Sequence, residues 1–104
     1  MKGENKVMLI DENLLIEREH LVGGVQRIYK LPNGYGLSAV NTEILHGYKF
    51  AWEFAVLENI KEVGGKITYD LTYDTELTQD VEVFQTTTKA NEFILKAFDV
   101  LAKL

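Results

Sequence analysis

The apolar residues of this chain recur at two different spacings, and the change between them falls near residue 87. In the middle of the chain every second residue is large and apolar: Tyr48, Phe50, Trp52, Phe54 and Val56. Further along, the apolar residues follow one helical stripe: Ala90, Phe93, Ile94, Ala97, Phe98, Leu101 and Leu104. A period of two is typical of strands, and a period near 3.6 is typical of amphipathic helices. The sequence therefore predicts a series of strands followed by one helix that begins at Thr87 or Thr88.

Glycine and proline divide the strand region into short runs. Gly23-Gly24 and Pro32-Asn33-Gly34 have turn composition, and they separate residues 14–22, 25–31 and 35–40. A meander of antiparallel strands is the simplest interpretation, although residues 14–22 also suit a short helix. In the second run Val25, Arg27, Tyr29 and Leu31 share one face. The run from Tyr48 to Val56 should form a central strand of the sheet. Small and charged residues alternate on its face opposite the aromatic residues, so we expect solvent or a thin covering there.

A second strand pattern follows the Gly64-Gly65 turn. Residues 67–74 alternate between apolar and polar side chains, which places Asp70 and Asp74 on one strand face. Residues 80–86 predict one more short strand. The fold class that results is α+β: an antiparallel sheet of about four to six strands, arranged as a meander and packed against one C-terminal amphipathic helix.

Length and composition indicate one domain over residues 1–104, with residues 1–12 as a flexible N-terminal segment. A chain of 104 residues is too short for two independent cores, and 46% apolar residues are enough for one. The absence of Cys excludes disulfides, thiolate catalysis and sulfur-based zinc sites. Acidic residues interrupt the first apolar run, so no signal peptide or membrane span is expected, and a cytoplasmic location follows.

The net charge of −5 argues against binding to nucleic-acid backbone, which requires a basic surface. The acidity is local. Residues 67–88 contain no Lys or Arg and five acids: Asp70, Asp74, Glu76, Asp80 and Glu82. A plain solvated strand face is one interpretation of this acidic run. The others are a general acid/base pair, a site for a hard cation, or a contact strip for a basic partner.

The sequence provides no motif that assigns catalysis, a metal or a cofactor. His20 and His46 lack the spacing of a zinc or catalytic motif, and "LPNGYG" lacks the Lys and further glycines of a phosphate loop. The acidic run also lacks the glycine and terminal glutamate of a calcium loop. We therefore expect no cofactor, no metal and no assigned catalytic residue.

Three stretches, "LPNGYGLSAV", "WEFAVLE" and "ITYD…YDTELTQDV", stand in that order in the chain. They resemble a family of short uncharacterised proteins from bacteriophages and prophages, with the pattern NGYG-S-V, E-AVL and TYDT-L--DV before a short helix. The match runs from about Tyr29 to Leu104. Two departures are a doubled "TYD" and an N-terminal third without a counterpart. The resemblance implies a phage protein in the bacterial cytoplasm and assigns no activity.

Three functional hypotheses follow. The first is a non-enzymatic domain that binds a host or phage protein, with the five acids of the acidic run as a contact strip. A homodimer is one possible arrangement of this domain. The second is a structural or assembly component that associates with itself. The third is a small metal-dependent hydrolase that uses Asp70, Asp74 and His46.

Overall fold

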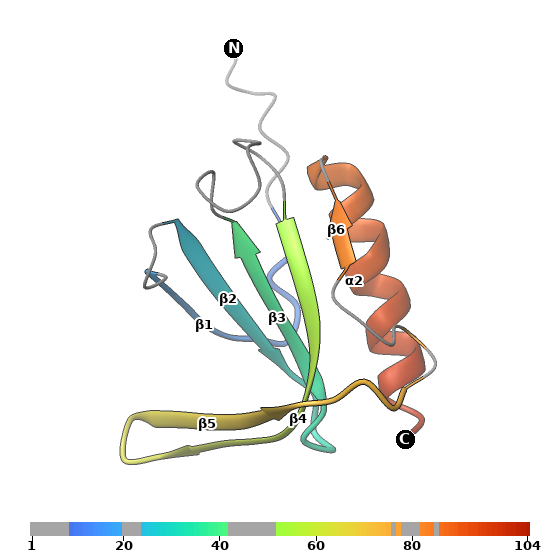
Figure 1. Cartoon of the computed structure of the whole chain (residues 1–104). Helices are drawn as coiled ribbons and strands as arrows, with labels where there is room; N and C mark the ends of the chain where they lie inside the picture. Colours follow the sequence, from blue (N-terminus) through green and yellow to red (C-terminus); the bar gives the residue numbers. More distant parts are fainter. Residues whose placement is uncertain (1–8, 20–23, 42–51, 76, 78–81, 85) are drawn as a thin grey trace.

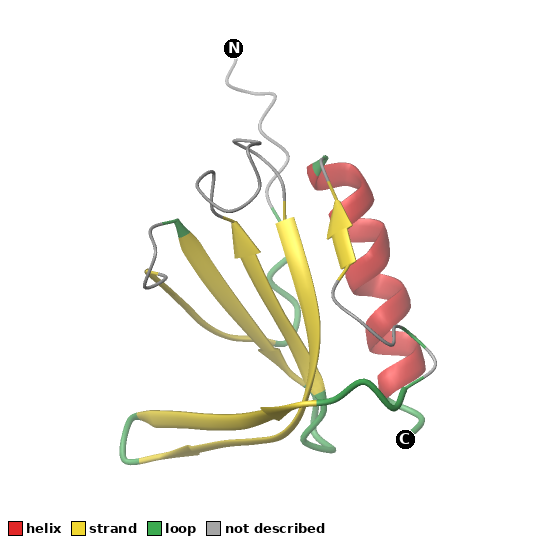
Figure 2. Ribbon diagram, in the orientation of Figure 1, coloured by secondary structure: helices red, strands yellow, loops and turns green. Residues whose placement is uncertain are grey.

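The computed structural model describes residues 9–19, 24–41, 52–75, 77, 82–84 and 86–104. This part of the chain contains six strands and one helix, as Figures 1 and 2 show. The strands are β1 (Leu14–Glu19), β2 (Val25–Lys30), β3 (Gly36–Asn41), β4 (Trp52–Val63), β5 (Lys66–Leu71) and β6 (Glu82–Phe84), and the helix is α2 (Thr87–Leu101). The predicted α+β class is confirmed, and the run that suited either state is a strand.

The sheet is the antiparallel meander that the turns predicted. Its strand order is β1-β2-β3-β4-β5, and β6 pairs with β4 outside this path. Trp52 of β4 lies opposite Phe84, whereas Leu57 lies opposite Leu71, so β6 and β5 pair with successive parts of β4. β4 begins at Trp52 in the described part of the chain, and Tyr48 and Phe50 of the predicted strand lie outside it. The short strand expected within residues 80–86 is confirmed as β6.

One face of the sheet is covered by α2, and we call it the helix-covered face. Figure 2 shows the helix packed along this side of the sheet. The buried residues here come from both layers and from the segment before β1: Leu9, Tyr29, Leu31, Leu37, Ala39, Phe54, Val56, Ala90, Ile94, Ala97, Phe98 and Leu101. The predicted helical stripe and the alternation of Phe54 and Val56 are thus confirmed. Leu104 is 53% exposed, because the helix ends at Leu101.

The helix begins at Thr87, which is one of the two predicted starts. Thr86 has an extended backbone, and its side chain accepts a hydrogen bond from the Lys89 N–H, so it is the N-cap. A threonine at this position supplies an acceptor to an amide that has no partner within the helix. The cap therefore fixes where α2 starts after the β6 segment.

The opposite face is strongly curved, and we call it the inner face. Its buried apolar residues are Ile28, Leu57 and Ile60, with Leu15, Ile16, Ile67 and Tyr69 packed around them. Figure 1 shows the β4–β5 hairpin bent away from α2 and under the ends of β1, β2 and β3. The thin covering expected for this side of β4 comes from β1 and β5 of the same sheet.

A bulge in β4 accounts for part of this bend. The register between β4 and β5 shifts between Glu58 and Lys61, and Asn59 has a φ of 56°. Asparagine tolerates this left-handed conformation better than most residues. A bulge bends its strand and increases the twist, and here it turns both Leu57 and Ile60 toward the inner face.

Gly36 allows the close approach of strands at the bend. A Cβ at this position would lie 1.8 Å from the Tyr29 carbonyl oxygen and 2.7 Å from the Ile60 side chain. The Ile60 N–H also donates a 3.1 Å hydrogen bond to the Gly34 carbonyl in the β2–β3 turn. The bulge is therefore held against a turn that has no room for a side chain at residue 36.

Candidate binding surfaces

The acidic run does not continue as a strand to Asp74. β5 ends at Leu71, and the prediction that Asp70 and Asp74 share a strand face is wrong. Backbone pairing with β4 reaches Thr72, which is 5% exposed and whose N–H donates to the Val56 carbonyl at 3.0 Å. Its hydroxyl then accepts from the Asp74 N–H at 3.3 Å, a local bond that turns the chain out of the sheet.

Asp70 lies on the outer side of the β4–β5 hairpin. It stands opposite Glu58, and its carboxylate accepts a 3.1 Å hydrogen bond from the Asn59 amide. Lys61 stands opposite Thr68 further along the same ladder. Two carboxylates are thus brought together here, one of them from outside the acidic run, and a lysine lies further along that ladder.

The rest of the proposed strip is described only in part. Asp74 is exposed in the loop after β5, whereas Glu76 and Asp80 lie outside the described residues. The backbone of Glu82 pairs with Phe54 in β6. His20 and His46 also lie outside the described residues. Among the residues that are described, no group of three or more His, Asp or Glu could hold a metal ion.

The same hairpin exposes large apolar side chains. Val63 is 75% exposed, Leu71 is 51% exposed, and Tyr73 just after the strand is 44% exposed. Among the described strands, β5 pairs only with β4, so its other edge presents unpaired backbone groups. Apolar side chains beside a free strand edge are typical of an interaction surface.

A buried arginine lies on the helix-covered face. Arg27 is 4% exposed and forms ion pairs with Asp11 and, at 2.7 Å, with Glu17. It also donates to the Tyr29 hydroxyl at 3.1 Å and to the Ile10 carbonyl at 3.2 Å. The Tyr29 hydroxyl in turn donates to the same carbonyl at 2.8 Å. This network attaches the segment before β1 to the sheet.

The network affects the ionisation of both buried groups. Burial acts to lower the pKa of Arg27, but its bond to Asp11 and its contacts with Tyr29 and Glu17 outweigh burial and raise that pKa. Burial raises the pKa of the Tyr29 hydroxyl, and the neighbouring guanidinium offsets part of this increase. Arg27 therefore stays charged and Tyr29 stays neutral at physiological pH.

A second polar network crosses the inner face. The Arg18 Nε donates to the Gln26 side-chain oxygen at 2.9 Å. The Gln26 amide nitrogen donates to the Ser38 hydroxyl at 3.1 Å and to the Tyr69 hydroxyl at 3.4 Å. Gln26 is 8% exposed, so its amide depends on these partners. Sequence reasoning did not identify these four residues, although the strand period would have placed Arg18 and Gln26 on facing positions once the register was known.

The hydrogen bond between Tyr69 and Gln26 can form only because the sheet is curved. β5 and β2 are three strands apart in the sheet order, which in a flat sheet is a separation of about 14 Å at ~4.8 Å per strand. Parallel side chains standing on such a sheet could not meet. The contact requires the sheet to fold toward itself, and the resulting inner face combines polar donors with apolar walls.

Comparisons with known proteins place the chain in no family: no protein-family model, no curated protein and no solved structure matches it. A search of the described residues for membrane-spanning helices finds none of sufficient length and apolar character.

Proposed function

We propose that the protein is a non-enzymatic domain that binds another protein through its β4–β5 hairpin. The observation that supports this most directly is the exposure of Leu71 and Tyr73 at the end of β5, whose other edge pairs with no described strand, and of Val63 at the turn end of the hairpin. The carboxylates of Glu58, Asp70 and Asp74 add negative charge to the same region. A partner with basic residues around an apolar patch would complement this surface.

The setting belongs to the same proposal. The resemblance to phage and prophage proteins suggests a host or phage protein as the partner, met in the bacterial cytoplasm. Glu76, Asp80 and Glu82 follow in the sequence and belong to the same proposed contact strip. Charge at such a strip would mainly increase the rate of association and exclude acidic partners, while the apolar side chains would supply most of the affinity.

A capture experiment tests the hairpin. The wild-type protein and two variants, Asp70→Lys/Asp74→Lys and Leu71→Ser/Tyr73→Ser, are immobilised and exposed to bacterial lysate. Matched controls are Glu92→Lys/Asp99→Lys and Leu95→Ser, which make similar changes at exposed positions of α2. Circular dichroism first establishes that each variant is folded. A partner retained by wild type and controls but lost by both hairpin variants supports the proposal, and equal capture by all proteins contradicts it.

Self-association is the second candidate, and the free edge of β5 favours it. Two copies related by a two-fold axis could pair their β5 strands antiparallel and cover Leu71 in the same interface. Sedimentation velocity at micromolar concentration distinguishes this arrangement from the first proposal. A dimer that Leu71→Lys dissociates would assign the edge to assembly, whereas a monomer at all concentrations would exclude this alternative.

The hydrolase alternative receives least support from the described geometry. Asp70 stands on the outer side of a strand, and Asp74 stands in the loop that follows. A melting temperature that rises with calcium or manganese in wild type, and not in Asp70→Asn/Asp74→Asn, is the result that this alternative requires.

A further inference from the structure

We propose that the inner face binds a small carboxylic acid with an apolar tail, held by the guanidinium of Arg18 and the hydroxyl of Tyr69. This site is separate from the hairpin surface and does not depend on the proposed function. Three features support this site. They are the direction of the hydrogen bonds around Gln26, the Arg18 nitrogens that have no partner among the described residues, and the half-buried apolar side chains beside them.

The direction of the network follows from Arg18. A guanidinium can only donate, so the Gln26 atom that faces it at 2.9 Å is the carbonyl oxygen. The amide nitrogen must then face the hydroxyls of Ser38 and Tyr69, and both hydroxyl oxygens accept from it. Each hydroxyl has one proton left to donate. Because Arg18 fixes the orientation of the Gln26 amide, the hydroxyls of Ser38 and Tyr69 both accept from Gln26 and are left free to donate their protons.

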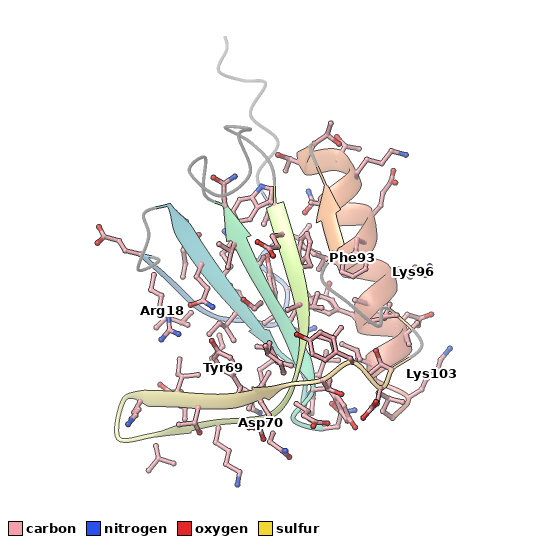
Figure 3. The ribbon with its side chains drawn as sticks, in the orientation of Figure 1. Arg18, Tyr69, Asp70, Phe93, Lys96 and Lys103 are labelled. Atoms are coloured by element: carbon pink, nitrogen blue, oxygen red, sulfur yellow. The ribbon has the colours of Figure 1, made fainter. Side chains whose placement is uncertain are left out.

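Accessibility selects which donors can reach a ligand. Ser38 is 7% exposed and serves mainly to hold Gln26, whereas Tyr69 is half-buried and Arg18 is exposed. Figure 3 shows Arg18 and Tyr69 directed into the same space bordered by β1, β2 and β5. A ligand there would meet hydrogen-bond donors from two strands at opposite ends of the sheet.

Arg18 keeps the edge of its guanidinium that suits a carboxylate. Its Nε is bound to Gln26, and its two terminal nitrogens have no further partner among the residues that the structure describes. Those two nitrogens form parallel hydrogen bonds with the two oxygens of a carboxylate. The bond to Gln26 also fixes the plane of the guanidinium, so less side-chain entropy is lost when a ligand binds.

The apolar side chains beside these donors specify the rest of the ligand. Ile16 of β1 and Ile67 of β5 are half-buried and pack against the inner cluster of Ile28, Leu57 and Ile60. A short alkyl or aromatic tail would cover their exposed parts while the carboxylate meets Arg18. The net charge of −5 opposes any anion, so we expect a dissociation constant on the order of millimolar.

The test uses hexanoate as the probe, with hexanamide as a neutral probe of the same length. Binding is followed by chemical-shift changes in the amide spectrum of the full chain at low salt. We expect hexanoate to shift amides of Arg18, Gln26, Ile67 and Tyr69, and hexanamide to bind at least about tenfold more weakly, because a charge-assisted pair is lost. Equal binding of the two probes would overturn the proposal.

Variants separate the carboxylate site from general charge effects. Arg18→Gln should weaken hexanoate binding by about tenfold or more, and Tyr69→Phe by a smaller factor of about three to five. Lys96→Gln removes one positive charge from an exposed position of α2 and should leave binding unchanged. If Lys96→Gln weakens binding as much as Arg18→Gln, the anion senses only net charge and the site is excluded.

A peptide whose last residue is apolar provides the other source of the same carboxylate. If such a peptide binds at least tenfold more tightly than hexanoate at the same amides, and its amidated form does not, a protein C-terminus replaces the small acid as the ligand. That result would overturn the choice of ligand made above.

Discussion

Two arginines on neighbouring strands face opposite sides of the sheet, and their surroundings differ. Arg27 on the helix-covered face is buried and uses all three of its nitrogens, with Asp11, Glu17, Tyr29 and Ile10 as partners. Arg18 on the inner face is exposed, and within the described residues only its Nε has a partner, which is Gln26. A saturated arginine holds the fold together, whereas an arginine with unused donors is available for recognition. The two faces differ in the same way: side chains of the helix-covered face mainly hold the fold together, whereas the inner face has donors available for recognition.

The largest difference in stability loss is expected between substitutions in the two apolar clusters. Phe54 is fully buried under α2, so Phe54→Ala should lower the free energy of unfolding by about 3–5 kcal/mol. Ile67 is half-buried on the inner face, and Ile67→Ala should cost less than about 1.5 kcal/mol. Urea denaturation of both variants measures this. Similar losses would mean that the inner cluster contributes as much to stability as the helix-covered core.

The second largest difference in stability loss is expected between substitutions of the two arginines. Arg27→Met should cost about 1–3 kcal/mol, because it removes several charge-assisted hydrogen bonds and leaves Asp11 and Glu17 beside each other without a cation. The partners are exposed carboxylates, which limits the loss. Arg18→Met should stay within about 0.5 kcal/mol of wild type. Chemical denaturation at low and high salt compares them, and a larger loss for Arg18→Met would reverse their assigned roles.

Removing the helix cap should affect only one face. Thr86→Ala should cost about 1 kcal/mol, because the Lys89 N–H loses its acceptor. The buried residues of α2 pack on the helix-covered face, so hexanoate binding by the folded variant should be unchanged. Thermal unfolding measures the first effect and the amide spectrum measures the second. A change in hexanoate affinity would show that the two faces are coupled.

The smallest effect is confined to alkaline pH. The pKa of Tyr29 is raised in the folded protein, so the unfolded chain loses its phenolic proton at lower pH than the folded chain does. The stability associated with this group is present below the ordinary tyrosine pKa of about 10 and is lost as pH rises through the folded value. Tyr29→Phe should therefore show a smaller decline in stability above pH about 10 than wild type. An identical decline in both proteins would contradict the assignment.

The order and type of the helix and strands could be predicted from the sequence, whereas the inner site could not. The period of two placed Arg27 and Tyr29 on one face, and the structure confirms it, because alternation is a local property of an extended chain. Curvature is not local. The approach of Tyr69 to Gln26 depends on the Asn59 bulge and on the absence of a side chain at Gly36, and neither feature alters the hydrophobic period.

The end of β5 was missed for a related reason. The alternation through Asp74 is regular, but the Thr72 side chain forms a bond to the next backbone amide but one and ends the ladder. Such a bond competes with strand pairing without changing the pattern of apolar residues. The partners of Arg27 could not be read from the sequence either, since Asp11 and Glu17 become neighbours only after β1 pairs with β2.

The attachment of Ile10 has a consequence for synthesis of the protein on the ribosome. Its N–H donates to Asn91 of α2, which lies 81 residues later in the chain. The meander can pair strand by strand as it emerges, but the apolar side that α2 covers stays open until the helix has been translated, several seconds later at ~5–20 residues per second. During that interval the nascent chain would present an uncovered apolar sheet face, which is the type of surface that promotes aggregation and that chaperones shield.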